Sequence, residues 1–216
     1  MSRDGRLETD VGSGADAPDA HLAEQVRALA ALNDLSMRLW RASGLRDGLY
    51  EILSESMAVT GADMGNVQIF DTAQNVLRME AHRGLPDAFV EKFREVSATD
   101  DTLCRHALRT GERVVICPGA PEVTVGPDGG PLRCVAKEEG CCAVQIVPLK
   151  SRNGAVLGLL CTQFRTRPCA GEARIHLPDG LARLAAAFIE HWHDEDELRR
   201  RERSPKPFLD PSSSEV

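Results

Sequence analysis

The sequence predicts an α+β fold in which helices from both ends of the chain cover one face of an antiparallel sheet. Long stretches of helical hydrophobic spacing lie near the two ends, at about residues 22–59 and from residue 171 or 178 to residue 203. The middle of the chain instead alternates apolar and polar residues and contains two hairpin signals. Strands joined by short turns run antiparallel, and the terminal helices must bury their apolar stripes against the sheet.

Two helices open the ordered part of the chain. The first spans about residues 22–42, because Leu22, Val26 and Leu29 recur at three- and four-residue steps before Ser-Gly ends the pattern. The second helix spans about residues 45–59 and also ends at a glycine. Both helices present one apolar face.

Two hairpins supply the four longer strands. The first occupies residues 64–84 around a polar turn at 71–75. The second occupies residues 141–164, and its turn ends in Asn153-Gly154, which is a strong hairpin signal.

The segment between the hairpins contains shorter elements. Residues 86–95 and 102–109 have the spacing of short helices, and residues 113–117 form a short strand. Residues 117–131 are rich in Pro and Gly and form a long loop, followed by a helical turn at 132–139. A loop of this length is uncommon inside a compact domain unless it is functional or mobile.

The length predicts one domain with two tails. Residues 1–20 lack hydrophobic periodicity and are predicted to be disordered, residues 21–203 form the domain, and residues 204–216 form a second disordered tail.

Composition excludes several functional classes. A net charge of −7 argues against nonspecific nucleic-acid binding, which requires a basic surface. No stretch approaches the ~20 apolar residues that span a bilayer, and no apolar segment of a secretory signal is found near the N-terminus. We therefore expect no membrane partner, a cytoplasmic location and reduced cysteines.

The chain has seven cysteines, and no two have the C-x-x-C spacing of a zinc site, so no metal site is predicted. Cys104 and His106 lie two residues apart on a predicted helix. They point about 200° apart there and cannot form a thiol–imidazole pair. Two interpretations stay open: Cys104 is an inert buried thiol, or this helix covers a pocket and Cys104 contacts a ligand.

Four segments together resemble a GAF domain, most closely those of bacterial sensor histidine kinases and related signalling proteins, over about residues 25–192. They are GADMGNVQIFD, LRMEAHRGLPDAFVEKF, CRHALRTGERVVI and AVQIVPLKSRNGAVLGLLCTQF. The resemblance implies a six-stranded antiparallel sheet, with terminal helices on one face and a small-molecule pocket on the other. Known pockets of the family take cyclic nucleotides, haem, bilins or amino acids, so the family does not determine the ligand.

Strand alternation selects the candidate pocket residues. Val67 and Ile69 share the apolar face needed by the terminal helices, which leaves the polar residues of the same strand on the opposite face. The same alternation in the second hairpin selects Gln145, Cys161 and Gln163, and the predicted helix over the pocket adds Cys104. The predicted ligand-binding residues are Asn66, Gln68, Phe70, Cys104, Gln145, Cys161 and Gln163.

Three buried glutamines are costly without hydrogen-bond partners. They either line a pocket suited to an uncharged or zwitterionic polar ligand, or bond to a covering loop. No cofactor is predicted by name. Haem would need an axial His ligand, for which His82 and His106 are the candidates.

The expected function is a stand-alone sensory or regulatory domain that binds an unknown small molecule. Acidic-before-basic pairs such as Glu195 and Arg199 extend the last helix, which favours a homodimer through the terminal helices. Because no kinase motif follows the domain, we expect signalling through a separate histidine kinase or regulator, as in a two-component system.

Two alternatives are a thiol-based enzyme similar to free methionine sulfoxide reductases and a ligand-free interaction module. The reductases have Gly-Val-Cys-Gly and His-Ile-Ala-Cys-Asp runs, which this chain lacks. Bilin-binding relatives usually have a cysteine followed by His, whereas Cys134 is followed by Val135. With no complete catalytic motif, we expect no enzyme activity.

Overall fold

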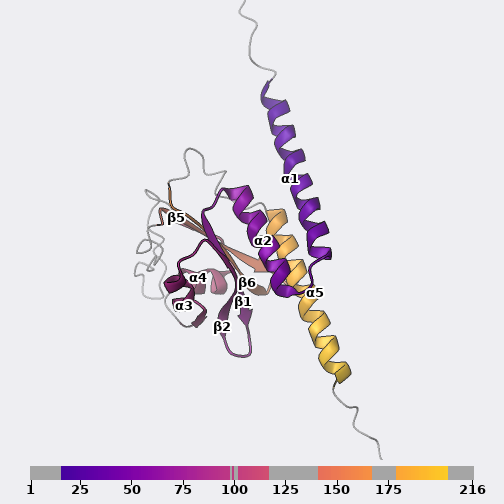
Figure 1. Cartoon of the computed structure of the whole chain (residues 1–216), viewed down its shortest axis with the longest axis vertical. Coiled ribbons are helices and arrows are strands. Elements are labelled where there is room, and N and C mark those ends of the chain that lie inside the picture. Colours follow the sequence, from indigo (N-terminus) through magenta and orange to yellow (C-terminus); the bar gives the residue numbers. More distant parts are fainter. Residues whose placement is uncertain (1–15, 98, 100–101, 117–140, 167–178, 204–216) are drawn as a thin grey trace, which may run out of the picture.

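The computed structural model describes residues 16–97, 99, 102–116, 141–166 and 179–203 (Figure 1). Its helices are α1 (Asp16–Trp40), α2 (Leu45–Thr60), α3 (Asp87–Lys92), α4 (Leu103–Thr110) and α5 (Asp179–Arg203). Its strands are β1 (Met64–Asp71), β2 (Val76–Arg83), β3 (Glu95–Ser97), β4 (Val114–Ile116), β5 (Ala143–Lys150) and β6 (Val156–Phe164).

The strands form one six-stranded sheet in the order β3-β2-β1-β6-β5-β4, and every neighbouring pair is antiparallel. The two predicted hairpins are therefore confirmed as β1–β2 and β5–β6. The α+β antiparallel fold is confirmed as well. β1 and β6, which are far apart in the sequence, pair at the centre of the sheet.

Helices α1, α2 and α5 lie on one side of the sheet, and α3 and α4 lie on the other (Figure 1). Apolar residues of α2 and α5 bury themselves against Val67 of β1 and Leu160 of β6, and α1 packs outside them. Fully burying a Leu or Ile side chain contributes about 1.5–3 kcal/mol. This core lies between sheet and terminal helices and includes Leu35, Leu49, Ile52, Leu53, Leu181 and Ile189.

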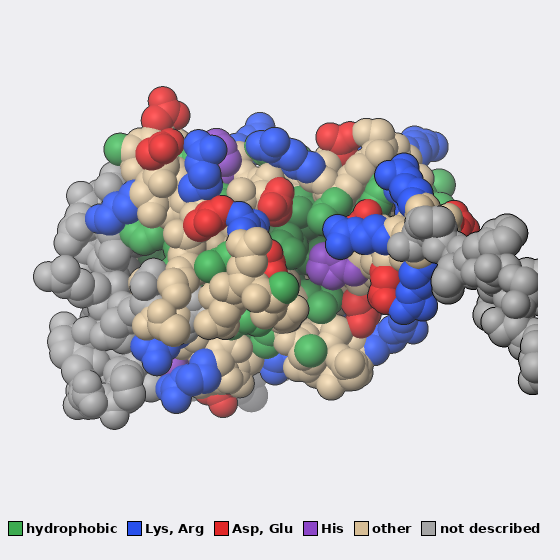
Figure 2. Space-filling model, turned by 90° about the horizontal axis from the view of Figure 1, so that it is seen from below, with side chains coloured by type: hydrophobic (Ala, Val, Ile, Leu, Met, Phe, Trp, Pro, Cys, Tyr) green, Lys and Arg blue, Asp and Glu red, His purple; other side chains and the backbone are tan. Residues whose placement is uncertain are grey.

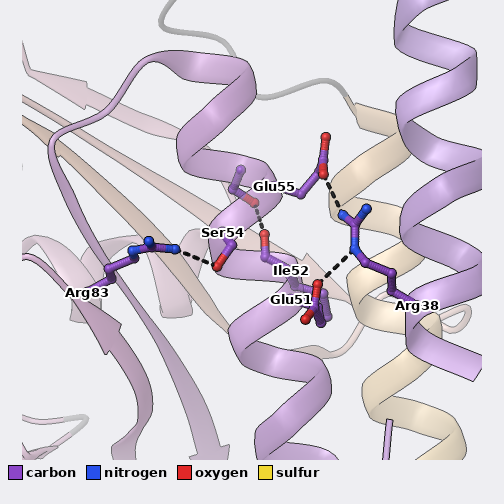
Figure 3. A network of polar contacts seen from close by, with 7 residues as sticks. Arg38, Glu51, Ile52, Ser54, Glu55 and Arg83 are labelled. Atoms are coloured by element: carbon purple, nitrogen blue, oxygen red, sulfur yellow. Dashed lines mark hydrogen bonds and ion pairs between the residues drawn. The ribbon is translucent and has the colours of Figure 1, made fainter. Parts of the chain in front are cut away.

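An ion-pair network joins α1 to α2 (Figure 3). Arg38 of α1 donates to Glu51 over 2.8 Å and to Glu55 over 2.5 Å, so one guanidinium spans two successive turns of α2. The three side chains remain 17–44% exposed, so each pair is worth at most about 1 kcal/mol. The network orients α1 on α2, while apolar burial supplies most of the stabilisation.

Several predicted boundaries differ from the structure. Helix α1 begins at Asp16, inside the segment predicted to be disordered, and ends at Trp40. A Pro in the first turn is compatible with a helix start, which the periodicity argument overlooked. The predicted helix at 86–95 is shorter, because residues 95–97 form the edge strand β3 along β2.

Other predictions fall outside the described residues. These are the loop at 117–131, the helical turn at 132–139, and the tails at 1–15 and 204–216. Helix α5 begins at Asp179, close to the later of the two starting points considered from the sequence.

Replacing Gly48 by Val tests the contact between α2 and α5. A β-carbon at Gly48 would overlap the Phe188 ring, so the larger side chain must push α5 away. We expect G48V to lower the free energy of unfolding by about 1–3 kcal/mol, although Val is the better helix former. Urea unfolding measures the change.

The matched control is G44S. A β-carbon at Gly44 meets nothing within 4 Å, and the extended backbone there suits a serine cap on α2. We expect it to change stability by less than about 0.5 kcal/mol. Equal stabilities for G48V and the wild type would contradict the described packing.

Candidate functional site

Helix α4 covers the face of the sheet opposite the terminal helices. Leu103 and Ala107 on one side of α4 are buried against Ile146 and Leu159. The helix is defined at both ends: the Thr102 hydroxyl accepts a hydrogen bond from the Arg105 N–H at 3.2 Å, and Gly111 ends it in the left-handed conformation.

Asn66 and Gln68 of β1 lie on the same side of the sheet as this helix. In the β1–β6 register Asn66 lies opposite Cys161 and Gln68 lies opposite Leu159, both of which pack in the cluster beneath α4. Directly opposite residues of an antiparallel pair share a face. The predicted face of Asn66 and Gln68 is therefore confirmed.

These two amides are buried without full hydrogen bonding. Asn66 is 3% exposed and Gln68 is 2% exposed. Asn66 Oδ1 and Gln68 Oε1 have no hydrogen-bond partner among the described residues. A buried polar atom without a partner costs about 1–3 kcal/mol, so each atom is a place where a ligand can bond favourably.

Two histidines lie on the same side of the sheet. His106 of α4 has a buried Nδ1 that also lacks a partner among the described residues. His82 of β2 lies directly opposite Asn66 in the β1–β2 register, and its side chain is half-buried. His82 is thus a neighbour of Asn66, and His106 belongs to the helix on the same side of the sheet.

Gln163 and Phe70 are at the two ends of this face. Gln163 is buried, and its Oε1 accepts a hydrogen bond from the Cys141 thiol at 3.3 Å. Phe70 is half-buried and packs against the apolar cluster beneath α4. Both lie on the predicted face, but Gln163 is already bonded to a neighbouring side chain.

The predicted face of Gln145 is wrong. Val147 and Leu149, two and four residues further along β5, pack beneath the terminal helices, and alternation places Gln145 on their side. There Gln145 Oε1 accepts a hydrogen bond from the Thr162 hydroxyl at 3.4 Å. The prediction failed because β5 is apolar on both faces, so apolar character did not identify the helix-covered one.

Cys104 and Cys161 pack in the same apolar cluster between α4 and β6. The Cys161 thiol donates a hydrogen bond to the sulfur of Cys104, which lowers the pKa of Cys104 and raises the pKa of Cys161. The backbone N–H of Cys104 lowers its pKa further, while burial opposes the shift. Sequence reasoning named both cysteines but could not pair them, because their contact depends on the sheet register.

The central part of the site is thus a row across three strands with a helix above it. His82, Asn66 and Cys161 lie side by side on β2, β1 and β6, and α4 on the same side of the sheet carries Cys104 and His106. In the part of the chain that the structure describes, no three His, Cys, Asp or Glu side chains gather closely enough to hold a metal ion.

The sequence matches the family model for a GAF domain over residues 44–190. The chain belongs to the GAF domain family. No curated protein matches the sequence. None of the described helices is long and apolar enough to cross a membrane.

Solved structures show the same fold at low sequence identity. The GAF domain of an Acinetobacter phosphoenolpyruvate-protein phosphotransferase is 17% identical, with a TM-score of 0.61 over 78% of this chain and 96% of that one. A domain of a two-component sensor histidine kinase protein from Sinorhizobium meliloti is 17% identical, with a TM-score of 0.54 over 74% and 99%.

A third similar structure is an enzyme with its substrate. The free methionine-R-sulfoxide reductase from Neisseria meningitidis is 16% identical, with a TM-score of 0.58 over 76% of this chain and 89% of that chain. At such low identities the similarity establishes the GAF fold only. The chemistry of the site has to be argued from this chain's own residues.

Replacing Cys161 by Ala tests the thiol contact. Because the Cys161 thiol donates the hydrogen bond that lowers the pKa of Cys104, C161A should raise that pKa and reduce the thiolate fraction at neutral pH. The rate of iodoacetamide labelling at Cys104, followed against pH by peptide mass spectrometry, reports the pKa.

The exposed thiol of Cys142 provides the control. C142S should leave the pH profile of Cys104 unchanged. An unchanged or lower midpoint in C161A would show that Cys161 does not donate to Cys104.

Proposed function

We propose that this chain is a sensory GAF domain that binds a small polar molecule between the sheet and α4. The observation that carries the proposal is the set of buried, unpartnered polar atoms on that side: Asn66 Oδ1, Gln68 Oε1 and His106 Nδ1. Such atoms are rare in folded proteins and call for a reason. A ligand that supplies their missing hydrogen bonds is the simplest one.

The residues also limit the chemistry of the ligand. Asn66 and Gln68 present amide oxygens, so the ligand should offer N–H or O–H donors. No Asp, Glu, Lys or Arg among the described residues is buried, so a net charge would enter the site without a buried counter-ion. A neutral or zwitterionic molecule fits best.

β1 provides the connection to the other side of the sheet. Asn66 and Gln68 alternate with Val67 and Ile69, which pack in the core beneath the terminal helices. A ligand that displaces the amides therefore also displaces residues that contact this core. We propose that this coupling carries the signal to the terminal helices.

The terminal helices have the surface for a homodimer. Helix α1 extends beyond the sheet at one end of the molecule and α5 extends at the other (Figure 1). Leu29 is 66% exposed and Trp40 is 87% exposed on α1, and Leu198 is 58% exposed on α5. Figure 2 shows hydrophobic side chains exposed between charged ones on the face seen from below.

A groove between α1 and α5 adds to this surface. Its volume is about 560 Å³, and its lining includes Trp40, Phe188 and Trp192. Exposed apolar side chains on one helix and an apolar groove beside it favour self-association. We propose that a second copy of the chain covers both.

The proposal includes no catalytic step. It makes the chain a cytoplasmic binding module whose output is a dimer or a separate histidine kinase or regulator. The likeness to a domain of a sensor histidine kinase protein supports a role in signalling. In a ligand-free interaction module, Asn66 Oδ1 and Gln68 Oε1 would stay buried with no ligand to bond them.

Replacing Gln68 by Met tests the ligand site. The substitution keeps the length of the side chain and removes the amide, so ligand affinity should fall about tenfold or more, because a hydrogen bond is lost. Binding is measured by calorimetry with the first neutral or zwitterionic compound that raises the melting temperature of the wild type in a thermal-shift screen.

Q145M is the matched control on the opposite face of the sheet. It removes the same amide from an equally buried position and should change the affinity less than about twofold. Weakened binding in Q145M with normal binding in Q68M would reject the site.

Replacing Trp40 by Glu tests the dimer. A charge at this position would be buried in the proposed interface without a partner, so the wild type should sediment as a dimer and W40E as a monomer. V59E places the same charge at an exposed Val of α2, outside the interface, and should leave the dimer intact. A monomeric wild type would contradict the proposal.

A further inference from the structure

The contact between Cys104 and Cys161 has a chemical consequence beyond ligand binding. The two thiols come from α4 and from the central strand β6, and both pack in the apolar cluster between them. Both thiols are free, α4 contacts β6 directly, and Cys104 packs against the cluster that contains Cys161. Two thiols on neighbouring elements of one packed cluster need only a local movement to form a disulfide.

The two cysteines differ in exposure and in acidity. Cys104 is partly exposed in the first turn of α4, whereas Cys161 is only 3% exposed in the middle of the sheet. The hydrogen bond from Cys161 lowers the pKa of Cys104 and raises that of Cys161. An oxidant therefore reacts first with the Cys104 thiolate, and the Cys161 thiol reacts in a second step.

We propose that Cys104 and Cys161 form a reversible disulfide when a two-electron oxidant such as hydrogen peroxide oxidises them. The Cys104 thiolate attacks one peroxide oxygen, the O–O bond breaks, and, with one proton taken up, sulfenic acid and one water form. The Cys161 thiol then attacks the Cys104 sulfur and releases a second water. Two thiols lose two electrons, which reduce one peroxide to two waters.

The disulfide ties α4 to the sheet beside Asn66, its neighbour across the β1–β6 register. It joins residues 57 positions apart in the sequence (161 − 104), so it restricts the unfolded chain strongly. The pair goes beyond the proposed sensory function, because oxidation needs no ligand and can be measured without one.

The experiment treats the reduced full chain with one equivalent of hydrogen peroxide, blocks the remaining thiols, and identifies the modified peptides by mass spectrometry. We expect a Cys104–Cys161 cross-link that dithiothreitol reverses, with Cys104 consumed at least about tenfold faster than the exposed Cys142. The oxidised chain should melt about 5 °C or more above the reduced chain.

Two variants sharpen the test. C161S should stop the reaction at a Cys104 sulfenic acid that dimedone traps, and C142S should form the same cross-link as the wild type. The proposal is overturned if the wild type forms a disulfide between other cysteines first, such as one with Cys141. It also fails if Cys104 reaches sulfinic acid without a cross-link, or reacts no faster than Cys142.

Discussion

The register between β1 and β6 is the constraint on which the rest of the structure depends. It places Asn66 beside Cys161 on the α4 face and Val67 beside Leu160 on the helix-covered face. A slip of one residue would exchange these faces and bury the amides against the terminal helices. The close approach of the strands requires Gly158, because a β-carbon there would collide with the Gln68 backbone oxygen. One pairing therefore determines the core, the polar row and the thiol contact.

Sequence patterns predicted the fold where local chemistry was distinctive. The polar alternation of Asn66 and Gln68 identified their face, and the turn ending in Asn153-Gly154 identified the second hairpin. The argument failed for Gln145, because an interior strand such as β5 with two apolar faces does not indicate which face the terminal helices cover. The contact between Cys104 and Cys161 was out of reach, since it arises from strand register and helix docking rather than from local sequence.

The energetics favour the α4 face as the ligand site that we propose. An unpartnered buried polar atom costs about 1–3 kcal/mol, a large fraction of the 5–15 kcal/mol that stabilises a typical domain. Asn66, Gln68 and His106 each contribute such an atom among the described residues. In natural proteins, buried polar atoms without hydrogen-bond partners are expected at functional sites. Among the described residues, the helix-covered core has one comparable atom, Gln145 Nε2, whereas Gln145 Oε1 accepts a hydrogen bond from the Thr162 hydroxyl.

The measurement that tests the central claim most directly is native mass spectrometry of the protein purified from its own cells. The account predicts a complex heavier than the chain by one small polar molecule per subunit, which is released on denaturation and is lost from Q68M but kept by Q145M. A wild-type protein that carries no such molecule, and binds none from an extract of the same cells, would contradict a ligand site beneath α4.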